Sequence, residues 1–333
     1  MGSAAFLVEA INQLAHEYLR LKQEQLQLIG KKGIDPSKYE DELRRVQHYI
    51  AVHNVYGVDL NPTAVELGAL SLWLTSIHQL KVKSERESRP DVYTPGATPW
   101  FGLRLRAGNS LIGARRAVWP EGQLRTGKFY GKNQDAPRLL KPGEARKPNE
   151  IYHFLVWDED MTPAARDRLM TQYWKDDCDK ISKWQKQEVK QKWTVEEIAL
   201  AKTISEKIDE LWEEYAIARV DGLKKTQCTA SVWPQRLDLN KGVSLVQQEK
   251  IKATLEVKSG AFQRLKLLMD SWCAFYFWPL EQSDNLPTRG VWLTSTELLL
   301  GGITWGDKKT KDMLKFQLGD SFDLDTLYEE SQN

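Results

Sequence analysis

Asp59 is the residue whose type and position point most directly to chemistry. It ends a short apolar run, Val55–Asp59, and a turn with Pro62 follows before an apolar-rich helical stretch. In doubly wound α/β folds, a carboxylate at the carboxyl end of a strand can accept hydrogen bonds from both hydroxyls of a ribose. The pattern therefore predicts a nucleoside-cofactor site at Asp59. One alternative stays open, because Asp is also a common N-cap and could cap the helix that begins near Pro62.

A turn of small residues, Gly2, Ser3 and Ala4, stands directly before a helical pattern that runs from Phe6 to Leu19. Small residues let a ligand approach the backbone closely, and the following helix offers N–H groups at its start. A nucleotide-binding fold places a strand before such a turn, and here the chain starts at the turn. We therefore expect the first strand to be missing or to be supplied by another polypeptide.

A third segment has the same form of a strand followed by a turn. Residues Leu103–Ala107 alternate as a strand does, and Gly108–Gly113 is typical of a turn. Asn109 lies in that turn, and its side-chain amide can both donate and accept hydrogen bonds. It is a candidate for cofactor contact, and the alternative is an ordinary turn residue.

Five segments of the sequence have helical patterns. The helical patterns cover residues 4–29, 37–52, 63–80, 162–227 and 243–275. Ser37 and Glu40 have the spacing of a capping box for the second helix. In the third helix, Leu67, Leu70, Leu74 and Ile77 share one face. Residues 83–98 are polar and contain Pro and Gly, so we expect a loop there.

Residues 115–150 change character, because basic side chains are interspersed with Gly and Pro. The basic residues are Arg115, Arg116, Arg125, Lys128, Lys132, Arg138, Lys141, Arg146 and Lys147. Two interpretations fit this composition, a solvated loop and a loop that contacts phosphates, and we favour the solvated loop.

Composition bounds the class of protein. The chain has 333 residues, 41% hydrophobic and 28% charged, with a formal net charge of +1, which is ordinary for a globular protein of about two domains. Cys178, Cys228 and Cys273 are widely spaced, and the five histidines show no metal-ligand spacing, so we expect reduced thiols and no metal site. No signal peptide or membrane-length apolar run is evident, and we expect a cytoplasmic protein.

In order and spacing, these segments resemble the amino-group DNA methyltransferases of restriction–modification and phage-defence systems, above all the large adenine-specific type IIG-like group. Gly2–Leu7 is similar to the second half of the family's first motif, Asp-Pro-x-x-Gly-Ser-x-x-Phe-Leu. Val58–Pro62, with the following Ala64–Trp73, resembles its second motif, and Gly108–Gly113 resembles its third. The segment Trp272–Pro279 looks like a helix of the family's inserted region. The resemblance is specific over residues 1–113 and looser beyond them.

The resemblance implies a role for each candidate residue. The turn of Gly2, Ser3 and Ala4 lies beside the methionine portion of S-adenosylmethionine, and Asp59 binds the ribose hydroxyls. Leu60 packs against the adenine ring, and Asn109 lies near it. The implied fold is α/β, a partial Rossmann-like class I methyltransferase domain with a large, mainly helical insertion. The expected parts are residues 1–114 for the cofactor, 115–160 as a basic irregular linker and 161–333 as the helical insertion.

The family's catalytic tetrapeptide, Asn/Asp-Pro-Pro-aromatic, does not occur in these 333 residues. In the family it holds the flipped-out target base and stacks on it, so we assign no catalytic residue here. We expect a cofactor-binding part of a DNA adenine methyltransferase that is inactive alone and acts on DNA with a partner chain carrying the tetrapeptide. The alternative is a non-catalytic binding or scaffold subunit, or a remnant, of a defence system that binds partner protein or DNA.

Overall fold

The computed structural model describes residues 2–77, 79–82, 92–95, 99–132, 134–227, 232–235 and 243–301. The chain divides into two compact units. The first contains Met1–Leu111 and Ala218–Leu255, and the second contains Ile112–Ile217 and Glu256–Asn333. The first segment of unit 1 therefore ends close to residue 114, where the sequence predicted the cofactor region to end. The expected helical region is divided between the two units.

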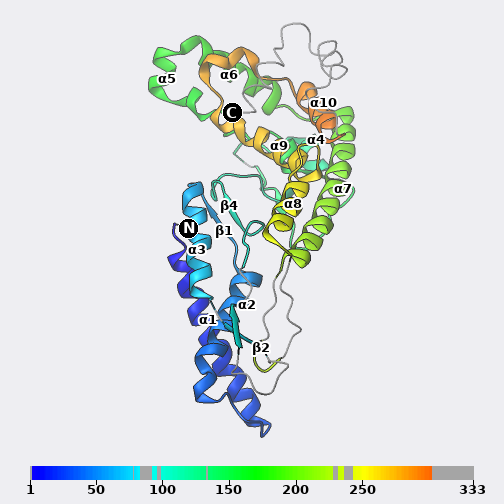
Figure 1. The fold of residues 1–333 in the computed structure, drawn as a ribbon. Coiled ribbons are helices and arrows are strands. Elements are labelled where there is room, and N and C mark those ends of the chain that lie inside the picture. The colour runs from blue at the N-terminus through cyan, green and yellow to red at the C-terminus, as the bar shows by residue number, and fades with distance from the viewer. Residues whose placement is uncertain are drawn as a thin grey trace. The chain divides into compact units, whose positions relative to one another are not determined.

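Unit 1 is built from helices around one short parallel strand pair (Figure 1). Its helices and strands are α1 (Ala5–Leu28), a 3-10 turn (Pro36–Lys38), α2 (Tyr39–Asn54), β1 (Gly57–Asp59), α3 (Pro62–Thr75), β2 (Gln79–Val82), β3 (Val92–Pro95), β4 (Leu105–Ala107), the last part of α7 (Val195–Thr226) and α8 (Leu245–Leu255). Strand β1 pairs in parallel with β4, and β2 pairs with β3 as an antiparallel hairpin. Apolar side chains of α1, α2 and α3 pack with Val55 and Leu105 in one core.

The predicted helix over residues 4–29 is confirmed, since α1 covers nearly the same span. The predicted capping box at Ser37 is wrong. The carboxylate of Asp35 instead accepts the Ser37 N–H and caps a 3-10 turn that holds Pro36 at its start, and α2 begins only at Tyr39. Asp35 followed by Pro36 therefore forms the helix start, and Ser37 lies within the 3-10 turn instead of capping α2.

The third helix is shorter than predicted. Helix α3 ends at Thr75, and residue 80 lies in β2 instead of the helix. Near this end the hydroxyl of Thr75 donates to the Ser71 carbonyl and that of Ser76 donates to the Leu72 carbonyl. Such side-chain bonds compete with helical backbone bonding, which explains an early stop. The expected loop over 83–98 contains β3, while residues 83–91 and 96–98 lie outside the described part of the chain.

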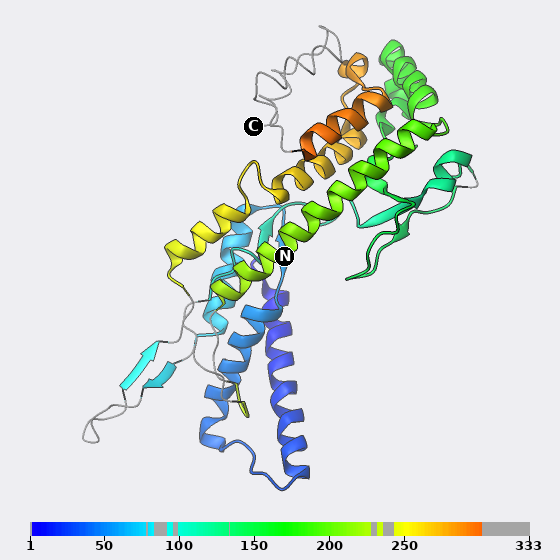
Figure 2. The same ribbon diagram turned by 90° about the vertical axis from the view of Figure 1, so that its right-hand side faces the viewer.

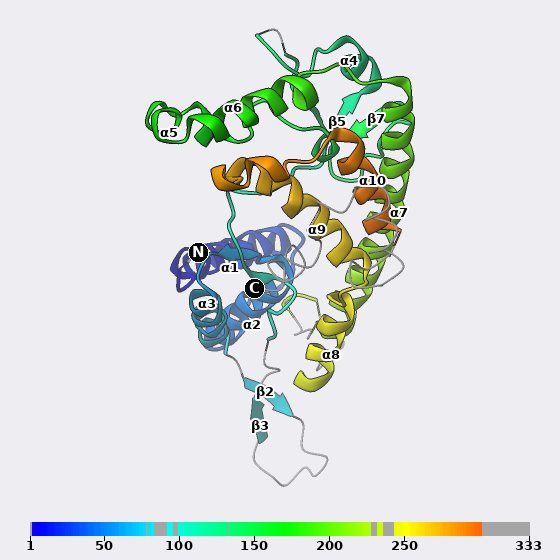
Figure 3. The same cartoon turned by 90° about the horizontal axis from the view of Figure 1, so that it is seen from above.

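Unit 2 combines a small antiparallel sheet with packed helices (Figure 2). Its helices and strands are β5 (Ala117–Pro120), α4 (Glu121–Thr126), β6 (Arg138–Leu139), β7 (Glu150–Tyr152), 3-10 turns at His153–Leu155 and Pro163–Arg166, α5 (Arg168–Tyr173), α6 (Lys175–Trp184), a π-helical turn (Gln185–Val189), the first part of α7, α9 (Ala261–Ala274), 3-10 turns at Phe275–Phe277 and Leu280–Asn285, and α10 (Arg289–Leu300). The sheet order is β6-β5-β7, and Figure 3 shows β5 beside β7. Residues 115–150, expected to be irregular, therefore carry this sheet and α4.

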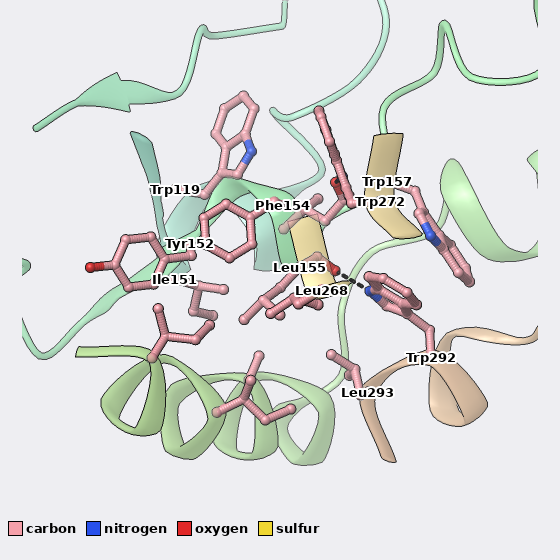
Figure 4. Packing of buried hydrophobic residues seen from close by; sticks show 14 of the residues in the cluster. Trp119, Ile151, Tyr152, Phe154, Leu155, Trp157, Leu268, Trp272, Trp292 and Leu293 are labelled. Atoms are coloured by element: carbon pink, nitrogen blue, oxygen red, sulfur yellow. Dashed lines mark hydrogen bonds between the residues drawn. The ribbon is translucent and has the colours of Figure 1, made fainter. Parts of the chain in front are cut away.

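The core of unit 2 is rich in tryptophan and tyrosine (Figure 4). Tyr152 and Phe154 are fully buried, and Trp157 and Trp272 are nearly so. Two of the buried indole N–H groups have acceptors, since Trp292 donates to the Leu155 carbonyl at 3.0 Å and Trp272 donates to the Val156 carbonyl. The Trp157 N–H, in contrast, has no hydrogen-bond partner among the described residues. The frequent tryptophans in this unit therefore act as core anchors.

Ile204, Ile208 and Leu211 of α7 are buried. The helix predicted over 162–227 is divided, because α5, α6 and the 3-10 and π-helical turns precede α7. The predicted helix over 243–275 is interrupted between α8 and α9, and the apolar face of α9 is buried through Leu265, Leu268 and Trp272. Cys178 and Cys273 are free thiols, and Cys228 lies outside the described residues. Among the described helices, none is both long and apolar enough to cross a bilayer.

Candidate functional site

The backbone of the β1–β4 pair places the predicted site at the carboxyl end of these two strands. The register pairs Gly57 with Leu105 and Asp59 with Ala107. Directly beyond the pair, the Gly108 N–H donates to the Asp59 carbonyl at 2.8 Å. Parallel strands end on the same side of a sheet, so the acidic strand end and the turn with Asn109 are brought together by main-chain bonds. Two of the three predicted segments meet here.

The third predicted segment, the Gly2 turn, contacts the side-chain carboxylate of Asp59. The Gly2 N–H donates to Oδ2 of Asp59 at 2.6 Å, across 57 positions of sequence. Gly2 has φ of 55° and Ala4 has φ of 64°, so the turn contains two left-handed residues before α1 begins. Ala4 is fully buried, and its carbonyl accepts the Val8 N–H in the first turn of the helix. Ser3 is exposed beside it.

The carboxylate of Asp59 holds local backbone as well. Its Oδ1 accepts the Asn61 N–H at 3.0 Å. Hydrogen bonds from the chain's amino terminus, from Asn61 and from Gly2 lower the pKa of Asp59 to about 2. The side chain is therefore an ionised acceptor near neutral pH, the state that suits hydroxyl donors.

Asn61, rather than Asp59, caps helix α3. The Asn61 side chain accepts the Thr63 N–H at 2.9 Å, and Pro62 occupies the first helical position. The alternative interpretation of Asp59 as the N-cap of this helix is thus wrong. The sequence signal was present, since Asn before Pro is itself a strong helix start.

The other two predicted residues lie at the surface near this point. Leu60 is 74% exposed, and Asn109 is exposed in its turn. The Asn109 side-chain oxygen accepts the Leu111 N–H at 2.9 Å, which is the bond of an ordinary Asx turn. Contact of Leu60 or Asn109 with a cofactor adenine remains a prediction.

Arg104 is a site-supporting residue that the sequence pattern concealed. Alternation along Leu103–Ala107 suggested an outward-facing side chain, yet Arg104 is only 5% exposed. Its Nη1 donates to the His53 carbonyl at 2.9 Å, and its guanidinium carbon lies 4.8 Å from the centroid of the Tyr56 ring. Burial lowers its pKa, while Tyr56 acts in the opposite direction. No local pattern reveals this, because both partners come from an earlier segment of the chain.

Two of the basic side chains in residues 115–150, which were candidates for phosphate contact, form ion pairs with carboxylates. Arg138 pairs with Glu150 at 2.8 Å and also with Glu144. Arg146 pairs with Asp209 at 2.8 Å, and its side chain is only 3% exposed. These two arginines connect the strands of the small sheet and α7 through ion pairs, which differs from both interpretations, the solvated loop and the phosphate-contacting loop. Within the described residues no cluster of His, Cys, Asp or Glu is arranged to hold a metal ion.

Comparison with known proteins gives one relative. Over 113 residues, the chain is 32% identical to a Methanocaldococcus jannaschii protein named "Putative type II restriction enzyme and methyltransferase RM.MjaORFECS2P". The match covers 34% of this chain and 8% of that protein, so the chain spans a small part of its relative's length. No protein-family model matches the sequence, and no solved structure matches it.

Proposed function

We propose that this chain is the cofactor-binding part of a DNA methyltransferase of a restriction–modification system. In this proposal it binds S-adenosylmethionine through a partial Rossmann-like class I domain, and the helical residues of unit 2 form an insertion. With a complementary chain that carries the Asn-Pro-Pro-aromatic tetrapeptide, it transfers a methyl group from the cofactor to the amino group of adenine in DNA. The 333 residues alone are inactive in methyl transfer.

The observation that carries the proposal is the meeting of the three predicted segments at Asp59. An ionised carboxylate stands at the carboxyl end of a parallel strand. The Gly2 N–H donates to this carboxylate at 2.6 Å, and the Gly108 N–H donates to the main-chain carbonyl of Asp59 at 2.8 Å. Two ribose hydroxyls are suitable donors for such a carboxylate. The Gly2 N–H is already one donor, so ribose binding exchanges that contact or adds to it. The relative from Methanocaldococcus jannaschii, which is named as a restriction enzyme and methyltransferase, also supports a role in methyl transfer.

Calorimetric titration of S-adenosylmethionine tests the cofactor step. The protein, its Asp59→Ala variant and a matched Asp35→Ala variant are compared. Asp35 is also an acceptor in unit 1, since it holds the Ser37 N–H, but it caps a separate 3-10 turn. We expect micromolar-range binding by the protein and by Asp35→Ala, and loss of about tenfold or more in affinity for Asp59→Ala, because hydrogen bonds to a charged group contribute about 1.5–3 kcal/mol.

Absence of binding by folded protein would overturn the cofactor role. Equal affinity in the protein and Asp59→Ala would overturn the role of this carboxylate. For methyl transfer, the measurement is incorporation of a tritiated methyl group into mixed-sequence DNA. We expect none with the chain alone and incorporation after a chain with the tetrapeptide is added. Incorporation by the chain alone would contradict the proposal that a second chain supplies the catalytic tetrapeptide.

A further inference from the structure

Arg104 joins three parts of unit 1 through its side chain and main chain. The side chain donates to the His53 carbonyl in the last turn of α2. Carbonyl groups in the last helical turn have no partner within the helix, and a cation is favourable there. The same guanidinium covers the ring of Tyr56, directly before β1. One buried side chain therefore fixes the end of α2 to the beginning of β1.

The main chain of Arg104 bonds Gly57, the residue that follows Tyr56 and begins β1. The Gly57 N–H donates to the Arg104 carbonyl at 3.1 Å, and the Arg104 N–H donates to the Phe101 carbonyl at 2.8 Å. Arg104 thus contacts Tyr56 with its side chain and Gly57 with its backbone. Tyr56, directly before β1, and Gly57, the first residue of β1, are therefore both fixed by the residue directly before β4.

The register of β1 determines which way the Asp59 side chain points. Side chains alternate between the two faces of a strand, so a slip of one position turns each side chain to the opposite face. Strand β1 has only three residues, and its register rests on few backbone bonds. In the observed register, Asp59 lies opposite Ala107 and its carboxylate meets the Gly2 N–H. A slip removes the carboxylate from that position.

We propose that Arg104 is the positioning residue for Asp59, setting the register of β1 so that the carboxylate faces the cofactor's ribose. The inference rests on the proposed function, because it concerns the same site. It goes further in assigning the orientation of the carboxylate to a buried arginine directly before the neighbouring strand, β4. Removal of Arg104 then reduces recognition of the ribose hydroxyls in particular, beyond any general loss of stability.

A positioning role of Arg104 can be distinguished from a general effect on stability by comparing the binding of two small ligands. Adenosine and 2′,3′-dideoxyadenosine differ in the hydroxyls that Asp59 is proposed to bind. Each is titrated into isotope-labelled protein and followed by amide chemical shifts, and the ratio of the two dissociation constants is compared among variants. A general loss of stability lowers the folded fraction for both ligands equally, so the ratio stays unchanged. We expect the protein to prefer adenosine by about tenfold or more.

The variants are Arg104→Met, Arg104→Lys and, as a control, Arg45→Met. Arg45 is a partly buried arginine on α2 that pairs with Glu42. We expect the ratio to fall below about threefold in Arg104→Met, to fall part-way in Arg104→Lys, and to be unchanged in Arg45→Met. If Arg104→Met does not fold, Arg104→Lys supplies the test, because lysine keeps a donor for the His53 carbonyl but loses the planar contact with Tyr56.

Each outcome has one meaning. A reduced ratio in folded Arg104 variants supports the positioning role. A full preference for adenosine in every folded Arg104 variant overturns that role and leaves the proposed function intact. No preference in the unsubstituted protein overturns the ribose role of Asp59, and the positioning role falls with it.

Discussion

The main-chain carbonyl of Asp59 accepts the N–H of Gly108 at 2.8 Å. This bond lies at the carboxyl end of the β1–β4 pair and joins the acidic strand end to the turn with Asn109. The two segments are therefore held together by a main-chain hydrogen bond. In the proposed function, such a bond lowers the ordering cost of cofactor binding.

The first prediction separates the roles of Asp59 and Asn61. Asn61→Ala removes the N-cap of α3, and we expect it to cost about 1 kcal/mol, seen as faster amide hydrogen exchange in that helix. We expect Asn61→Asp to retain the protection, because aspartate is an equally good cap. Affinity for S-adenosylmethionine should change by less than about threefold in both, in contrast to Asp59→Ala. Loss of α3 protection in Asp59→Ala with unchanged affinity would contradict this assignment.

The second prediction concerns the leucines of α3. Leu72 is fully buried, whereas Leu74, two positions later on the same helix, is 57% exposed. We expect Leu72→Ala to lower the free energy of unfolding of unit 1 by about 2–5 kcal/mol, and Leu74→Ala to change it by less than about 0.5 kcal/mol. Urea unfolding monitored by hydrogen exchange within α1–α3 measures both. A comparable loss in Leu74→Ala would mean that the exposed leucine is covered in solution.

The same pair of leucines shows where helical periodicity failed as a guide. Leu67, Leu70, Leu74 and Ile77 were predicted to share one face, and such a stripe ordinarily faces a core. In the structure all four are at least 40% exposed, and the buried positions of α3 are Gly68 and Leu72. The helix is apolar on several sides, so periodicity alone cannot say which side packs. The packed side is set by contacts with α1, α2 and β4, which belong to other segments of the chain.

Local patterns succeeded where the cause was local. The span of α1 follows from its own apolar spacing. The strand-end position of Asp59 follows from a short apolar run before a turn. The burial of Arg104 could not be predicted in this way, because the His53 carbonyl and the Tyr56 ring become its partners only in the folded unit.

The third prediction tests the buried arginine of unit 2. Arg289 is 5% exposed; it bonds Glu197 at 3.0 Å and several carbonyls of residues 188–192, and it lies over the Trp193 ring. Arg289→Met leaves these acceptors without a donor, and we expect a loss of about 3–5 kcal/mol in the free energy of unfolding. Arg289→Lys should recover only part, because an ammonium group cannot reproduce the planar fork.

Arg166 is the matched control for that experiment. It pairs with Asp160 at 3.1 Å, but the two side chains are 43% and 73% exposed. Exposed pairs contribute little, so Arg166→Met should change the free energy of unfolding by less than about 0.5 kcal/mol. Chemical unfolding followed by tryptophan fluorescence reports unit 2 directly, since its core holds most of the buried indoles. Equal effects of the two substitutions would refute the bridging role of Arg289.

The last prediction is a pH dependence in unit 2. His153 is buried, stacks on Trp272 with ring centroids 5.0 Å apart, and accepts the Arg115 N–H through Nε2. Burial, with a smaller effect of Arg115, lowers the pKa of His153 to about 4. The unfolded chain, with an ordinary histidine pKa of about 6.5, therefore binds the proton more readily than the folded protein between these values.

As the pH falls from about 6.5 to 4, protonation of His153 favours the unfolded chain. The free energy of unfolding therefore decreases by up to about 3 kcal/mol over this range. Urea unfolding at a series of pH values measures this slope. His153→Gln keeps an acceptor for the Arg115 N–H but has no titrating group, so the slope should become shallower. Burial also lowers the pKa of His53 in unit 1, so some slope remains. The exposed His16→Gln control should retain the full slope, and an unchanged slope in His153→Gln would mean that His153 titrates alike in both states.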